Sequence, residues 1–201
     1  MIFVLYKKRI LSTESFDIAQ MLVDRARKGD QQSMHRLYKM YVRAMYNVSI
    51  RIVANQLDAE DILQESFASA FCNLDAYKGE SSFGAWLKRI VINKSINHVK
   101  KQKVWFAEVE HLPEKEDTLG EDDLSGENFF DKISPEMIHE AIKTLPAKAK
   151  TVLTLYLLED YPHKDIARML DISESTSKSQ YQRARKLLQE RLLKMANKNT
   201  P

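Results

Sequence analysis

The amino-acid sequence predicts an all-α protein made of two small helical domains joined by a flexible acidic linker. Three observations support this fold class. Apolar residues recur at helical steps of three and four along most of the 201 residues. The five Gly and five Pro fall mainly between these periodic segments, as expected for helices joined by a few connections. Acidic residues gather in one interval that separates two basic stretches.

The uneven charge distribution predicts both the linker and the kind of partner. Residues 1–103 carry 17 Lys and Arg against 10 Asp and Glu, residues 104–134 carry 2 against 10, and residues 135–201 carry 12 against 8. The net charges are therefore +7, −8 and +4, although the whole chain carries only +3. Basic domains suit a polyanionic partner, and an acidic interval that contains Gly suits a solvated linker.

Four helices are predicted within 15–103, after an N-terminal arm over 1–14. The first spans 15–28 and the second ends near Asn55, while the third has Asp58 as its N-cap and the fourth begins near Ser82. A turn over 78–82 separates the last two. The expected apolar stripe of the first helix is Ile18, Met21, Leu22 and Ala26. The expected stripe of the second is Met34, Leu37, Tyr41, Met45, Val48 and Ile52.

The region after the linker, over 135–201, contains a predicted helix-turn-helix. Helical patterning resumes at Ser134 and continues to Leu145, and Pro146 starts the next helix. The apolar side of that helix is expected to contain Val152, Leu153, Leu155, Tyr156 and Leu157. A short helix over 163–170, a tight turn over 171–173 and a longer helix over 174–195 then follow. In this motif the second helix enters the DNA major groove.

Several classes of protein are excluded or disfavoured. The single cysteine, Cys72, is expected to be a small buried side chain in a reducing cytoplasm. The five histidines show no ligand spacing, so we expect no metal site and no cofactor. The charges Lys7, Lys8 and Arg9 follow a short apolar run, the reverse of a signal peptide, and no segment is long enough for membrane insertion. No nucleophile and base pair or Gly-rich phosphate loop indicates an enzyme.

Two segments of the first domain carry ordered motifs. The run from Asp58 to Phe67 contains a D-x-x-Q-E core, here Asp61, Gln64 and Glu65, and the segment 83–101 reads F-x-x-W-L-x-x-I-x-x-N with a basic tail. These segments resemble the polymerase-binding helix and the next helix of the sigma-70 family of bacterial RNA polymerase sigma factors. Where the family often has Asp in that helix, this chain has Asn97.

The segments 145–155 and 165–174 resemble the second promoter-reading module of the same family, as does Lys178-Ser179 followed by Arg183-Ala184-Arg185. Three departures stand out. Lys150 occupies a position where Arg is common, Asp160 replaces a helix-turn Gly, and 175–177 reads Ser-Thr-Ser instead of Gly-Thr-Val. The resemblance covers roughly 20–103 and 134–193 without further domains, which is typical of the small extracytoplasmic-function (ECF) class.

The resemblance implies a sigma factor that binds core RNA polymerase and directs promoter-specific transcription initiation by recognising promoter DNA and helping to open it. Its expected partners are the promoter duplex, the melted single strand and an anti-sigma factor. Asp61, Gln64 and Glu65 are assigned to polymerase binding, and the loop 78–82 to holding an unstacked minus-ten base. The residues assigned to the minus-ten element are Lys78, Ser81, Ser82, Arg89, Asn93, Asn97, Lys100 and Lys101. Those assigned to the minus-thirty-five element are Ser175, Thr176, Lys178, Ser179, Gln182, Arg183, Arg185 and Lys186.

Alternative interpretations remain open from the sequence alone. In isolation, the three polar residues of the D-x-x-Q-E core are merely a solvated helix face, and the loop 78–82 is a plain turn. Trp86 is expected in the core rather than stacked on a base. A dimeric helix-turn-helix regulator that acts without polymerase would explain the C-terminal half, but it would leave the D-x-x-Q-E helix unexplained.

Overall fold

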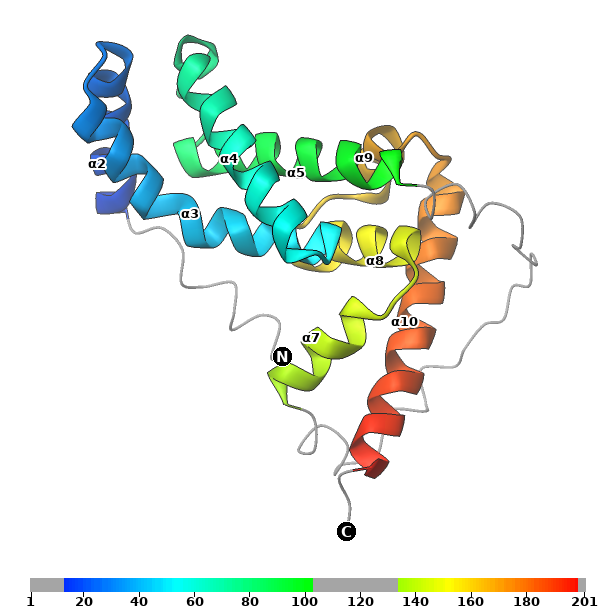
Figure 1. The fold of residues 1–201 in the computed structure, drawn as a ribbon. Helices are drawn as coiled ribbons and strands as arrows, with labels where there is room; N and C mark the ends of the chain where they lie inside the picture. The colour runs from blue at the N-terminus through cyan, green and yellow to red at the C-terminus, as the bar shows by residue number, and fades with distance from the viewer. Residues whose placement is uncertain (1–12, 103–133, 199–201) are drawn as a thin grey trace. The chain divides into compact units, whose positions relative to one another are not determined.

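The computed structural model describes residues 13–102 and 134–198, and every regular element in these two ranges is a helix (Figure 1). This confirms the predicted all-α class. The chain divides into two compact units, and the division falls within helix α5 between Ser95 and Ile96. The predicted boundaries at 103 and 134 stay predictions, because the acidic linker lies almost wholly outside the described residues. Residues 1–12 of the arm predicted over 1–14 also lie outside the described residues, and helix α2 begins at Thr13, within the predicted arm.

The first unit is built from three helices, a short 3₁₀ turn and the start of a fourth helix. These are α2 (Thr13–Arg27), α3 (Gln31–Val53), α4 (Gln56–Cys72), η2 (Leu74–Ala76) and α5 (Phe83–Lys101), which continues past the division. Gly29, with φ of +87°, makes the turn after α2. Asp30 then caps α3 by accepting a hydrogen bond from the backbone N–H of Gln32 at 3.1 Å.

The N-cap of α4 is Asn55, and the prediction of Asp58 was wrong. The Asn55 side chain accepts a hydrogen bond from the Asp58 N–H at 3.1 Å, so Asp58 belongs to the first turn of the helix. Ala54 ends α3 in the left-handed region with φ of 58°, which lets the next helix begin almost at once. The Asp58 carboxylate still faces the positive end of the helix dipole.

The predicted stripe of α3 is confirmed, because its residues from Leu37 to Ile52 are buried and only Met34 is half-exposed. The stripe of α2 was partly wrong. Ile18 and Met21 are 49% and 46% exposed, because the buried side of this helix is rotated toward other positions. The buried residues of α2 are Ala19, Leu22, Val23 and Ala26.

Cys72 is exposed, contrary to the expectation of a buried side chain. It is the last residue of α4, and the chain turns immediately afterwards through Asn73 into η2. Leu74 and Tyr77 therefore bury the apolar end of this segment instead, at 4% and 2% exposure. The core contacts at this end of α4 are thus made by the residues that follow Cys72, and its side chain faces water.

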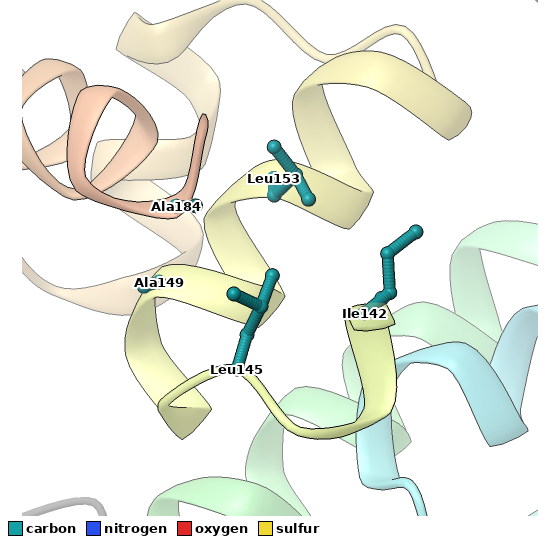
Figure 2. Packing of buried hydrophobic residues seen from close by; sticks show 5 residues of the cluster. All are labelled: Ile142, Leu145, Ala149, Leu153 and Ala184. Atoms are coloured by element: carbon teal, nitrogen blue, oxygen red, sulfur yellow. The ribbon is translucent and has the colours of Figure 1, made fainter. Parts of the chain in front are cut away.

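The second unit packs the long C-terminal helix against shorter helices. Its elements are α7 (Pro135–Lys143), α8 (Ala147–Leu153), the π-helical turn η5 (Thr154–Leu158), α9 (His163–Leu170) and α10 (Glu174–Lys198). Pro146 precedes α8 as its N-cap, so it starts this helix as predicted. Figure 2 shows the core cluster that joins α7, α8 and α10, which consists of Ile142, Leu145, Ala149, Leu153 and Ala184.

The apolar side predicted for the helix after Pro146 was wrong at its end. Val152, Leu153 and Leu155 are buried, but Tyr156 and Leu157 are each 37% exposed. The helix changes here to a π turn, in which the N–H of Glu159 donates to the carbonyl of Thr154 at 3.1 Å. An extra residue in one turn rotates the following side chains about the axis.

Candidate functional site

The three residues of the D-x-x-Q-E core form one exposed face of α4. Asp61, Gln64 and Glu65 are all exposed, at positions i, i+3 and i+4 of the helix. The opposite side of the same helix holds the core residues Ala59, Ile62, Leu63, Ser66, Phe67 and Ala70. The structure therefore brings the three polar groups together on a surface that packing leaves open.

This acidic face already has one cationic neighbour within the unit. Lys94 of α5 approaches Glu65 with 3.4 Å between Nζ and Oε2, and the two side chains are 32% and 68% exposed. An exposed pair of this kind contributes only about 0.2 to 1 kcal/mol. Glu65 is consequently available to a stronger partner at little cost to the fold.

The loop over 78–82 presents Lys78 and Ser81 to solvent. Ser82 is half-exposed and has a structural role, since its hydroxyl oxygen accepts a hydrogen bond from the N–H of Ala85 at 3.2 Å. It thereby caps the start of α5. Gly79 adopts φ of +77°, a conformation that favours glycine. Trp86 is half-buried, with its ring centroid 5.7 Å from that of Phe83.

The remaining minus-ten candidates form a stripe along α5. Arg89, Asn93 and Asn97 follow at steps of four, and all three are exposed. Lys100 continues the stripe and is half-exposed, while the exposed Lys101 lies to one side. The stripe thus combines cationic groups with amides, which suit phosphates and base edges respectively.

The C-terminal helix pair has the geometry of a helix-turn-helix. Asp171 ends α9 in the left-handed region with φ of 58°, and α10 starts three residues later at Glu174. Ser173 caps α10, since its hydroxyl accepts from the N–H of Thr176 at 2.9 Å. The exposed residues of α10 assigned to DNA are Ser175, Lys178, Ser179, Gln182, Arg183, Arg185 and Lys186.

Several of these side chains already have partners within the unit. The hydroxyls of Ser175 and Thr176 each lie 2.7 Å from that of Ser173, and Thr176 is only half-exposed. Lys178 pairs with Glu174 at 2.8 Å. Arg183 and Lys186 lie farther along the helix, beyond this polar cluster.

Sequence reasoning missed a side-chain contact between the two helices of the motif. His163, the first residue of α9, lies with Nδ1 2.9 Å from the hydroxyl oxygen of Ser177, which is buried in α10. Its ring stacks on that of Tyr156, with centroids 4.3 Å apart and planes 10° apart. Burial lowers the pKa of His163 below 6.5, and the Lys178 ammonium lowers it further. No local sequence signal links residues 14 positions apart.

The described residues contain no group of three or more His, Cys, Asp or Glu side chains that is arranged to hold a metal ion. Within the same ranges, no helix is both long and apolar enough to span a bilayer. The features that the two units do present are polar helix faces.

Comparison with known proteins gives matches over both units. Residues 37–104 match the family model for Sigma-70 region 2, and residues 136–188 match that for Sigma-70, region 4. The ECF RNA polymerase sigma-E factor of Haemophilus influenzae is 30% identical over 186 residues, which cover 86% of this chain and 94% of that protein. The RNA polymerase sigma-H factor of Pseudomonas aeruginosa is 30% identical over 186 residues, which cover 86% and 93%.

A solved complex of the sigma factor RpoE with the anti-sigma factor NepR from Bartonella quintana gives a TM-score of 0.49 at 23% identity, over 80% of this chain and 96% of that chain.

The two family models follow one another in the order that the sequence resemblance implied. The chain therefore belongs to the ECF group of sigma-70-family RNA polymerase sigma factors, non-enzymatic initiation factors that direct promoter-specific transcription together with RNA polymerase.

Proposed function

We propose that this sigma factor divides its work among three surfaces: the exposed face of α4 binds core RNA polymerase, the loop 78–82 with α5 binds the minus-ten element, and α10 reads the minus-thirty-five element. One observation carries the proposal. Nearly all the residues assigned to the three surfaces are exposed, on helices whose opposite sides form the cores. Side chains that packing does not use are the ones that a partner can bind.

On α4, Asp61 and Glu65 place two carboxylates one turn apart, with the Gln64 amide between them. Such a face complements a basic helix, and the charge-assisted hydrogen bonds it makes are stronger than neutral ones. Lys94 is the cation that polymerase must displace from Glu65. When it does so, Lys94 is released beside Asn93, on the helix proposed to contact DNA.

For the minus-ten element, the proposal assigns one task to the loop 78–82 and another to helix α5, which follows it. The loop around Lys78 and Ser81 holds an unstacked base, and the stripe of α5 follows the adjacent strand. Asn93 and Asn97 supply amides that both donate and accept hydrogen bonds, whereas Arg89, Lys100 and Lys101 supply charge. Phosphate contacts of this kind position the strand without reading it.

For the minus-thirty-five element, the first turns of α10 enter the major groove. Ser179, Gln182 and Arg183 are proposed to reach base edges, and Arg185 and Lys186 to contact phosphates. Arg185 is positioned for this by its own unit, since its guanidinium carbon lies 5.9 Å from the centroid of the Tyr181 ring. Tyr181 also packs against the core, so the contact limits where Arg185 can reach.

The acidic interval 104–134 is proposed to link the two predicted DNA-reading domains, 15–103 and 135–201. Once one domain is bound, the other is presented at a high effective concentration, so neither needs high affinity alone. Like the polymerase it serves, the protein is proposed to act in the cytoplasm. Membership of the family also supports the proposal that an anti-sigma factor binds this chain. Adding such a protein to the purified chain should prevent the chain from co-eluting with core polymerase.

Site-specific photocrosslinking tests the three assignments together. A crosslinking amino acid is placed at Gln64, Asn97 or Gln182 of the full chain, in a complex with core polymerase and promoter DNA. We expect crosslinks to a polymerase subunit, to the minus-ten strand and to the minus-thirty-five duplex, respectively. Lys39, an exposed residue of α3 outside all three surfaces, is the control position. Crosslinking of Gln64 to DNA, or equal yields from Lys39, would contradict the assignment.

A further inference from the structure

The loop 78–82 is held in shape from inside the first unit. Tyr77, which precedes it, is only 2% exposed. Its hydroxyl donates a hydrogen bond to the carbonyl of Ser81 at 2.7 Å, which closes the residues between them into a ring. Burial raises the pKa of Tyr77, so this hydroxyl keeps its proton and remains a donor. The carbonyl of Ser81 therefore points inward, toward Tyr77, while the Ser81 side chain is left for solvent.

Arg27 at the end of α2 fixes the base of the same loop. Its Nε and Nη2 donate to the carbonyl of Leu74 at 3.3 and 3.2 Å, and Nη2 also donates to the carbonyl of Tyr77. The guanidinium carbon lies 5.9 Å from the centroid of the Tyr77 ring. Asp24, one turn earlier, pairs with Nη1 at 3.3 Å and orients the group. A planar fork of donors serves this geometry in a way that a single ammonium does not.

Gln20 supports the loop from behind, one turn before Asp24 on α2. Its Oε1 lies 3.3 Å from the hydroxyl oxygen of Tyr77. The same oxygen is 4.0 Å from the place that a Cβ on Gly79 would occupy, so the side chain lies against the loop at ordinary contact distance. Two residues of α2, Gln20 and Arg27, about fifty positions away in the sequence, thus converge on Tyr77 and the segment around it.

We propose that Tyr77 and Arg27 are positioning residues for minus-ten recognition, which hold the loop in its base-accepting conformation before DNA arrives. This inference rests on the proposed role of the loop in holding an unstacked base. Binding by a loop that is already ordered avoids the entropy cost of ordering it on contact. Neither residue touches the base itself, since Tyr77 is buried and Arg27 is bonded to the backbone carbonyls of Leu74 and Tyr77.

The test uses the full chain in complex with core polymerase and a forked promoter whose minus-ten strand is single-stranded. Tyr77→Phe removes one hydroxyl and keeps the ring, and Arg27→Lys keeps the charge and loses the fork. Tyr38→Phe is the matched control, because the Tyr38 hydroxyl makes no hydrogen bond among the described residues while its ring packs edge-on against Phe67, with centroids 4.8 Å apart. Affinity is measured on the intact strand and on strands with one base removed at each minus-ten position.

We expect Tyr77→Phe and Arg27→Lys to weaken binding to the intact strand about 5- to 10-fold. The loss should disappear on the strand that lacks the held base, and Tyr38→Phe should match the unaltered protein throughout. Equal losses with and without that base would show a purely structural role and overturn the inference. If the unaltered protein ignores every missing base, the base-holding role of the loop fails, and the inference fails with it. Should Tyr77→Phe not fold, Arg27→Lys decides the matter.

Discussion

Reversing the charge of the α4 face is predicted to abolish polymerase binding while leaving the fold intact. In the variant Asp61→Lys plus Glu65→Lys, folding loses the pair between Glu65 and Lys94, which at 3.4 Å and with both side chains exposed is worth at most about 1 kcal/mol. The repulsion that replaces it acts between two exposed ammonium groups and is screened by solvent and salt. Binding loses two charge-assisted hydrogen bonds of about 1.5 to 3 kcal/mol each. The sum corresponds to a decrease in affinity of roughly 10² to 10⁴-fold.

The assay is the fluorescence anisotropy of the labelled chain titrated with core polymerase, together with circular dichroism to verify folding. The matched control is Glu140→Lys plus Glu190→Lys, which makes the same change in charge in the second unit. It also breaks a comparable exposed pair, between Glu140 and Lys143 at 2.6 Å. A folded α4 variant that binds polymerase within about 3-fold of the unaltered chain would refute the reasoning, as would an equal loss in the control.

Three further predictions concern the rest of the molecule. Arg183→Ala should cost about 1 to 3 kcal/mol of binding free energy on the cognate minus-thirty-five element and reduce discrimination among DNA sequences. Lys186→Ala should instead weaken binding to all sequences alike and lower the slope of log affinity against log salt concentration by about one. Equal, sequence-blind losses for both variants in a salt series of promoter binding would show that the reading face is misassigned. Burial lowers the pKa of His163 in the folded state below its unfolded value of 6.5, so the unfolded chain binds a proton more readily than the folded one. The free energy of unfolding should therefore decrease as the pH drops through 6.5 toward the folded pKa. Hydrogen exchange of α10 amides measures this loss, and His163→Gln should lack it; an identical pH profile in both proteins would contradict the prediction. A Cβ on Gly84 would lie 2.7 Å from Cε1 of the buried Tyr41. We therefore expect Gly84→Ala to destabilise the first unit by up to about 2 kcal/mol, because the clash outweighs the gain of about 1 kcal/mol in helix propensity. Hydrogen exchange measures this, and greater protection of the α5 amides in the variant would contradict the prediction.

The helix-turn-helix was predictable because its signals are local. A short amphipathic helix, a turn at Asp171 and a serine cap at Ser173 all lie within a dozen residues, and each has a direct physical meaning. The face of α4 was predictable for the same reason, since i, i+3 and i+4 spacing places side chains together in any helix. Family resemblance then supplied the roles, which no spacing alone provides.

The errors arose where competing local signals or distant contacts decide the structure. Both Asn55 and Asp58 are good caps, and the left-handed turn at Ala54 decides in favour of Asn55. The π turn that exposes Tyr156 leaves no mark in the apolar pattern. The hydrogen bonds that Arg27 makes to the carbonyls of Leu74 and Tyr77, just before the loop 78–82, join residues nearly fifty positions apart, so only the folded structure contains them.

The most direct test of the central claim is run-off transcription on genomic fragments with core polymerase, with and without this chain. Core polymerase alone should give no discrete starts. Addition of the chain should produce defined start sites that share minus-ten and minus-thirty-five sequences, and the Asp61→Lys plus Glu65→Lys variant should not. Tight DNA binding by the chain without any chain-dependent start site would contradict the assignment and point to a regulator that acts without polymerase.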